Sequence, residues 1–177
     1  MNEAQSLQRA IDEPVHLAEY DPAWPAHFDA ERERLLERFP AALIEVQHIG
    51  STAIPGMPAK PIIDVMAGVA SMAVADFLFE PILDHGYVTS VEFNAGLTDR
   101  RWFMRHANGR RTHHLHVVAY DGKLWHQRLA FRDALRTDAA LAERYAALKR
   151  ELALRHGTDR EAYTRAKGEF IRCVCAS

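Results

Sequence analysis

The order of apolar and polar positions divides the chain into helices and strands. Residues 15–20 are predicted as a short strand or an extended lead-in. Asp21-Pro22 then starts a helix that runs to about Phe39, because Asp caps a first turn and Pro fits within it. Two apolar runs of strand length follow at 43–49 and 61–69. Residues 71–85 have the spacing of a helix that ends at Gly86, and 87–91 that of a short strand.

A β-hairpin is predicted over residues 100–120, because Asn108-Gly109 stands between two alternating runs. Residues that oppose one another across a hairpin lie on the same face of the sheet. A two-residue turn predicts these pairs: Arg105 with Thr112, Phe103 with His114, and Arg101 with His116. This register places two arginines and two histidines on one face, which has the composition of a binding site. The opposite face has the composition of a core.

The rest of the chain is helical. Apolar residues recur at helical spacing over residues 122–136 and 138–156, and Gly157 ends the second of these helices. A last helix follows, with an apolar stripe that includes Tyr163 and Phe170.

Composition and charge narrow the class of protein. A chain of 177 residues with 48% hydrophobic and 26% charged residues fits one globular domain, predicted here as 15–177 after a flexible polar tail at 1–14. The net charge of -2 gives no overall attraction to nucleic acid or anionic membranes, and no apolar run is long enough to cross a bilayer. Cys173 and Cys175 point in different directions on a helix, which favours free thiols and a cytoplasmic location.

Candidate chemistry concentrates between His48 and Asp64. Gly50 and Ser51 form a tight turn after a strand, where free backbone N–H groups and a hydroxyl suit a phosphate. Asp64 stands in an apolar strand, so its carboxylate requires a hydrogen-bond partner, an ion pair or a metal. Lys60 is one candidate for that ion pair.

Several motifs together resemble the GrpB family of the nucleotidyltransferase superfamily. They are His-Ile-Gly-Ser-Thr-Ala-Ile-Pro-Gly at 48–56, Lys-Pro-Ile-Ile-Asp at 60–64, Thr-His-His-Leu-His-Val-Val at 112–118, and segments at 131–136 and 163–171. The family is also similar to the C-terminal extension of some dephospho-coenzyme A kinases. The resemblance implies an α+β fold, a nucleotidyltransferase-like mixed sheet flanked by helices with a C-terminal helical portion.

The resemblance also implies a site. Active members of the superfamily follow the Gly-Ser turn with an Asp-x-Asp/Glu pair that holds Mg²⁺, but here Met66 stands at the second carboxylate position after Asp64. His114 or His116 stands where a third carboxylate would be, and imidazole is a poor Mg²⁺ ligand. The predicted catalytic residues are Asp64 and His116. The predicted phosphate- or substrate-binding residues are Gly50, Ser51, Lys60, Arg101, His114 and Lys167. The predicted metal ligands, for Mg²⁺, Mn²⁺ or Zn²⁺, are Asp64, His114 and His116.

Three functions remain open at this point. The first is binding of a phosphorylated small molecule, with a nucleotide as the first candidate, and metal-dependent nucleotidyl transfer. The second is a non-catalytic binding or folding-support module that has lost its second carboxylate at Met66. The third is metal-dependent hydrolysis at Asp64, His114 and His116. Nucleic-acid binding through the arginines of 100–111 is less favoured, because the charge is near neutral and no recognition motif is present.

Overall fold

A four-stranded mixed sheet organises the protein in a computed structural model that describes residues 15–176. The strands are β1 (Glu45–Ile49), β2 (Ile63–Val69), β3 (Arg100–Ala107) and β4 (Arg110–Ala119), in the spatial order β1-β2-β4-β3. The central pair β2 and β4 is parallel, and both outer pairs are antiparallel. The α+β prediction with a mixed sheet is confirmed. The tail predicted at 1–14 lies outside the described residues.

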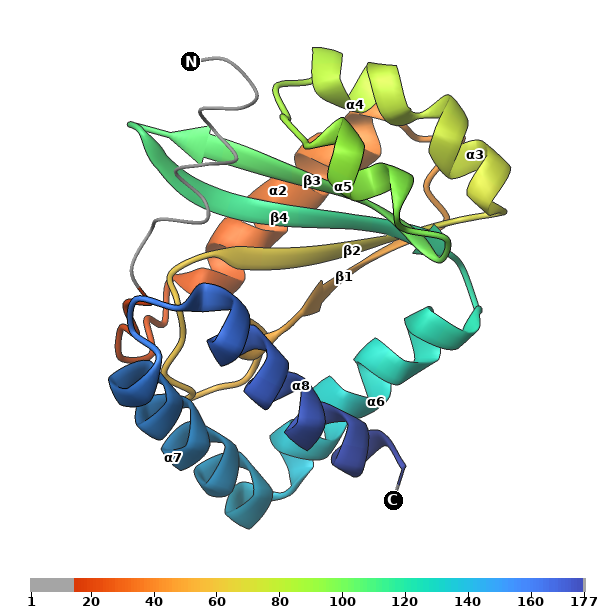
Figure 1. The fold of residues 1–177 in the computed structure, drawn as a ribbon. Coiled ribbons are helices and arrows are strands. Elements are labelled where there is room, and N and C mark those ends of the chain that lie inside the picture. Colours follow the sequence, from red (N-terminus) through yellow and green to blue (C-terminus); the bar gives the residue numbers. More distant parts are fainter. Residues whose placement is uncertain (1–14, 177) are drawn as a thin grey trace.

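Helices lie on both sides of this sheet (Figure 1). The first half of the chain contributes α2 (Trp24–Arg38), the one-turn helix η1 (Ser51–Ala53), α3 (Met72–Phe77), α4 (Phe79–Asp84) and α5 (Val91–Ala95). The C-terminal portion contributes α6 (Lys123–Thr137), α7 (Ala139–Arg155) and α8 (Arg160–Cys175), which gather on one side of the sheet in Figure 1.

The main hydrophobic core lies between one face of the sheet and α2, α3 and α4. Val65 and Ala67 of β2 and Phe103 of β3 are fully buried there against Leu35 of α2 and Ile82 of α4. Alternate residues of a strand point to opposite faces, so the intervening residues of β2, including Asp64 and Met66, face α6 and the other C-terminal helices. The sheet therefore separates a continuous apolar core from a second face that carries polar groups.

The hairpin forms where the sequence predicts it, but the predicted register is wrong. Asn108 and Gly109 have φ angles of 52° and 73°, as a two-residue turn requires. A β-bulge between Arg105 and His106 then shifts the pairing by one residue, so that Arg101 pairs with Val117 and Trp102 pairs with His116. A shift of one residue moves each side chain to the opposite face. The arginine that shares the histidine face is therefore Arg100 and not Arg101.

Two local predictions also change. The helix expected over 71–85 is interrupted at Leu78 and becomes α3 and α4. The strand expected at 87–91 is reduced to one bridge between Val88 and Met104, after which Ser90 caps α5 by accepting a hydrogen bond from Phe93 N at 3.1 Å. The helices predicted at 22–39, 122–136 and 138–156 and at the C-terminus all form. Within residues 15–176, every helix is too short or too polar to cross a membrane.

Candidate functional site

The Gly50-Ser51 turn brings the end of β1 against the carboxylate of Asp64. Gly50 has a φ of 72°, a left-handed conformation that other residues rarely adopt. A Cβ atom at this position would lie 2.5 Å from Asp64 Oδ2, so the carboxylate occupies the space that any side chain would need. Glycine is required here both by the backbone angle and by the approach of Asp64.

Two arginines of α6 fix this turn in place. Arg132 Nη1 donates to Gln47 Oε1 at 2.7 Å and to the His48 carbonyl at 3.0 Å, and Arg136 Nε donates to the Ala53 carbonyl at 2.8 Å. These bonds hold both ends of the turn to one helix, and Arg132 is itself buried. Through these bonds, the motif at 131–136 holds the Gly50-Ser51 turn against α6.

Asp64 lies beside His114 and His116, as the sequence predicts. The parallel pairing of β2 with β4 places Asp64 directly opposite His114. Asp64 Oδ1 is 3.1 Å from His114 Nδ1 and 3.7 Å from His116 Nε2. Arg111 Nη1 lies 3.1 Å from His114 Nε2, and because an arginine can only donate, this nitrogen is the acceptor. The ring proton of neutral His114 is therefore on Nδ1, where it is donated to Asp64.

The titration of these groups follows from their burial and mutual contacts. Burial lowers the pKa of His114 to about 4, although Asp64 acts in the opposite direction, and burial also lowers the pKa of His116. Burial raises the pKa of Asp64, but hydrogen bonds and charge from His114 and His116 outweigh it and hold that pKa well below its usual range. At neutral pH the cluster is one carboxylate with two neutral imidazoles.

Three lysines surround Tyr145 and Tyr163 near the cluster. The Nζ atoms of Lys60 and Lys167 lie 5.0 Å and 5.6 Å from the centre of the Tyr163 ring. Lys149 of α7 is 1% exposed, its Nζ donates to the Pro58 carbonyl, and it lies 4.9 Å from the centre of the Tyr145 ring. Burial lowers the pKa of Lys149 to about 7, assisted by the charges of Lys167 and Arg150.

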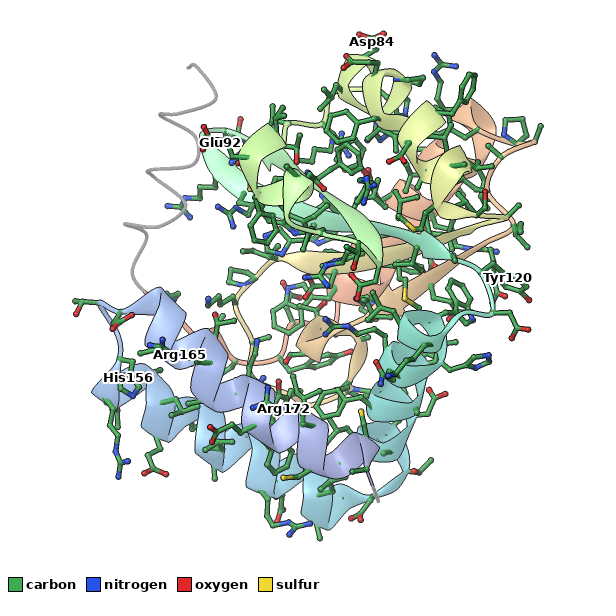
Figure 2. All side chains as sticks on the ribbon, turned by 45° about the vertical axis from the view of Figure 1, so that its right-hand side comes forward. Asp84, Glu92, Tyr120, His156, Arg165 and Arg172 are labelled. Atoms are coloured by element: carbon green, nitrogen blue, oxygen red, sulfur yellow. The ribbon has the colours of Figure 1, made fainter. Side chains whose placement is uncertain are left out.

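These groups line one cavity of about 630 Å³ between the sheet and α6, α7 and α8. The cavity has the size of a small-molecule site. Its cations are Lys60, Lys149, Lys167, Arg128 and Arg172, and Asp64 is the one carboxylate among the described residues that line it. Figure 2 shows Arg172 on the half of α8 that leads to the C-terminus, with Arg165 in the other half. The lining described here thus holds more basic than acidic side chains, in a chain of net charge -2.

The donor set does not fit a bound metal. Within the described residues, no group of three or more His, Cys, Asp or Glu side chains is arranged to hold a metal ion. The proton on His114 Nδ1 faces Asp64 and Arg111 occupies Nε2, so neither nitrogen presents a free lone pair. Met66 is fully buried against Ile49 and Trp125, so the second carboxylate position belongs to the apolar core. The structure brings the predicted ligands together as a hydrogen-bonded cluster.

Arg101 is the predicted site residue that lies elsewhere. Its Nε donates to Asp76 Oδ1 of α3 at 2.6 Å, on the face of the sheet opposite His114 and His116. Gly50, Ser51, Lys60, Asp64, His114, His116 and Lys167 all line the cavity. His48, which the motif includes, has a structural environment, since it stacks on Phe28 and its Nε2 lies 2.9 Å from Thr52 Oγ1.

Sequence reasoning missed the contribution of Lys149, Arg128 and Arg172. Each stands in an amphipathic helix, where a cation is typical of a solvent-exposed face. One signal was available: the chain has four lysines, and three of them line this cavity while Lys123 is outside it and exposed.

Comparison with solved structures identifies the class of fold. The Cid1 poly (U) polymerase bound to Mg 3'-dATP superposes with a TM-score of 0.52 at 15% identity, over 92% of this chain and 52% of Cid1. At this identity the likeness shows the fold alone, which is nucleotidyltransferase-like. The conserved protein GrpB from Enterococcus faecalis superposes with a TM-score of 0.78 at 32% identity, over 91% of this chain and 98% of that chain.

Residues 14–177 match the model of the GrpB protein family, and the chain belongs to this family. It is 37% identical to the UPF0157 protein YqkA of Bacillus subtilis over 158 residues, which cover 89% of this chain and 45% of YqkA. It is 34% identical to the dephospho-CoA kinase of Mycolicibacterium paratuberculosis over an alignment of 195 positions, gaps included. This alignment covers 94% of this chain and 46% of the kinase. The chain thus spans about half the length of both relatives.

Proposed function

We propose that this protein binds a phosphorylated small molecule, with a nucleotide as the favoured ligand, in the cavity between the sheet and α6 to α8. The observation that carries the proposal is the charge of the cavity wall, where five Lys and Arg residues face one carboxylate. A lining with more cationic than carboxylate side chains attracts anions to a partly enclosed cavity, because low-dielectric walls focus the field. The cavity volume of about 630 Å³ suits a ligand of this size.

Two further observations support phosphate as the anionic group. The Gly50 turn lies at the cavity wall together with Ser51 and the lysines, which gives a phosphate both backbone and charged donors. The fold is shared with Cid1, whose structure contains Mg 3'-dATP, and this makes ATP and its analogues the first ligands to test.

A second candidate function is a non-catalytic binding module, and Met66 favours it. This side chain is 0% exposed in the core between β2 and α6, so a second metal-binding carboxylate has no counterpart in the fold of this chain. Both candidates share the anion-binding cavity. They differ in whether bound nucleotide is converted to product, which incubation with labelled ATP and Mg²⁺ followed by product separation would measure.

Binding is tested by thermal shift and calorimetry with ATP, ADP and AMP, each with and without Mg²⁺. We expect Lys60→Met and Lys167→Met each to weaken nucleotide binding by roughly tenfold, since each removes a charge-assisted contact. Lys123→Met is the matched control and should bind as the wild type does, because Lys123 lies outside the cavity. Absence of binding by all three nucleotides, or equal weakening by Lys123→Met, would contradict the proposal.

Asp64→Asn separates metal-free from metal-bridged binding. If the anion contacts the cations directly, removal of the one carboxylate lowers repulsion, and nucleotide binds with equal or higher affinity in the absence of metal. If a metal on Asp64 bridges to the phosphates, the variant loses the increase in affinity that Mg²⁺ gives the wild type. The first outcome is favoured, because Asp64 already accepts a hydrogen bond from His114 Nδ1, with His116 Nε2 at 3.7 Å.

A further inference from the structure

Helix α8 carries a glycine in its interior, on the face that lines the cavity. Gly168 stands in the middle of the 16 residues of this helix. Glycine is one of the least favourable residues inside a helix, because its backbone loses the most conformational freedom on folding. The residues of α8 that line the cavity recur at helical spacing and include Thr164, Lys167, Gly168, Ile171, Arg172 and Cys175. The unfavourable residue therefore stands on the face that a ligand would meet.

Neither the backbone nor the packing of the protein requires glycine at this position. Gly50 has a positive φ, and a Cβ at Gly68 would lie 2.9 Å from Trp125, but Gly168 has an ordinary helical backbone. A Cβ built at Gly168 would lie 3.5 Å from Arg172 Nη1, which is an ordinary van der Waals contact. Among the described residues outside its own helix backbone and its two chain neighbours, no other atom lies within 4 Å. A side chain at position 168 would thus enter open space in the cavity.

The surroundings of Gly168 suit a flat, uncharged group beside a phosphate. Arg172 lies one turn further along α8, and a planar guanidinium stacks on the face of an aromatic ring. The C-terminal end of α8 lies beside α6, since Cys175 Sγ is 3.7 Å from the Gln127 carbonyl oxygen. Helix α6 adds the apolar side chains of Leu124 and Phe131 to the lining. The residue before Gly168 is Lys167, which is one of the cations proposed to bind phosphate.

We propose that Gly168 and Arg172 form the surface on which a planar ring of the ligand lies, so that the site selects a phosphorylated molecule with a heteroaromatic ring. The inference rests on the proposed function and deepens it, because it assigns the ring to α8 and the phosphates to the lysines. Glycine at position 168 keeps the space for the ring open. The loss of helix stability at this position is therefore the cost of specificity for the ring.

Calorimetry on the full chain with ATP and with inorganic tripolyphosphate tests this surface, because the second probe has the phosphates and no ring. Gly168→Leu should lower the affinity for ATP at least tenfold and leave the affinity for tripolyphosphate within twofold of the wild type. Cys173→Leu is the matched control and should bind both probes as the wild type does, since Cys173 is exposed on α8 and outside the cavity lining. Gly168→Ala should weaken ATP binding about threefold while it raises the Tm by about 2 °C, because alanine favours the helix.

The outcomes distinguish the ring surface from the function on which it rests. Unchanged ATP affinity in both Gly168 variants, with weaker binding in Lys60→Met and Lys167→Met, would overturn the ring surface and leave the proposed function intact. Equal weakening of ATP and tripolyphosphate in Gly168→Leu would also overturn it, because the added side chain would then block the phosphates. Binding of neither probe to the wild type would overturn both proposals. If Gly168→Leu fails to fold by circular dichroism, Gly168→Ala decides, since its higher Tm and weaker ATP binding have opposite signs.

Discussion

The charged side chains on the two faces of the sheet differ in the partners that they contact. On the α2 face, Glu31 is 1% exposed and accepts hydrogen bonds from Tyr87, Arg34 and Arg105. Arg101 on that face is likewise matched by Asp76. On the α6 face, five Lys and Arg residues line a cavity in which Asp64 is the one carboxylate among the described residues, and Asp64 already accepts a hydrogen bond from His114.

This difference separates charges that hold the fold from charges that we propose bind a ligand. A buried carboxylate surrounded by its own donors is satisfied inside the protein, so it needs nothing from outside. Cations that outnumber the carboxylates in the lining of a cavity attract an anion into it. The protein therefore carries similar residues on both faces, and only their partners distinguish the face that we propose as the site.

The largest effect is expected when the closed network of the α2 face is broken. Glu31→Ala leaves Arg34, Arg105 and Tyr87 without their shared acceptor, and we expect it to lower the free energy of unfolding by roughly 3 kcal/mol. Urea denaturation measures this change, with exposed Glu33→Ala as the control. Burial raises the pKa of Glu31, but hydrogen bonds from Arg34 and Tyr87 outweigh it, so the pKa in the folded protein lies below the usual value of 4.5. The stabilisation is therefore present above pH 4.5 and is lost as the pH falls through the pKa of the folded protein. An equal loss in the Glu33 variant would contradict this assignment.

The next effect concerns the turn of the cavity face. Gly50→Ala should lower stability by at least about 2 kcal/mol, because it forces a left-handed alanine and places a Cβ against Asp64. Gly56→Ala is a matched control: Gly56 also has a positive φ, of 77°, but no atom lies within 4 Å of a Cβ built there. The difference between the two variants in urea denaturation measures the contact with Asp64 together with the cost of the ψ angle of -171° at Gly50. Equal losses would show that Asp64 moves aside freely.

A smaller effect should appear as a pH dependence of stability. Lys149 has a pKa of about 7 in the folded protein against 10.5 for an ordinary lysine, so between these values the unfolded chain binds a proton that the folded chain lacks. Stability should therefore rise with pH above about 7, by up to about 1.4 kcal/mol per pH unit, and be lost as pH falls to 7. Lys149→Met should flatten this slope between pH 7 and 9, whereas Lys123→Met should not. An unchanged slope in Lys149→Met would assign the dependence to another group.

The smallest effect is expected for the arginine that the hairpin bulge turns away from the site. Arg101→Met should cost less than about 1 kcal/mol, since its partner Asp76 is 56% exposed and such pairs contribute little. Nucleotide affinity should be unchanged in calorimetry. A tenfold loss of affinity would show that Arg101 reaches the cavity and would contradict the observed register.

Much of the fold was predictable because local patterns determine it. Each of these features depends on residues that are close together in the sequence: the helical periodicity of the C-terminal portion, the Asn108-Gly109 turn and the apolar strands. The grouping of Asp64 with His114 and His116 was also predictable, since strand alternation and the family motifs together indicate it. The break at Leu78 between α3 and α4 was not, because the residues of 71–85 keep one continuous helical pattern across it.

The sequence by itself determined the strands, the glycine turn and the carboxylate that faces it. Only the tertiary structure decided which cations join them. One bulge after Arg105 moved Arg101 to the face opposite His114 and His116, because strand faces alternate with every residue. Lys149 is 89 residues from Lys60 in the chain, and the packing of α7 against the loop before β2 brings both to one cavity. Local patterns do not specify such distant contacts, so the charge of the site emerged only with the fold.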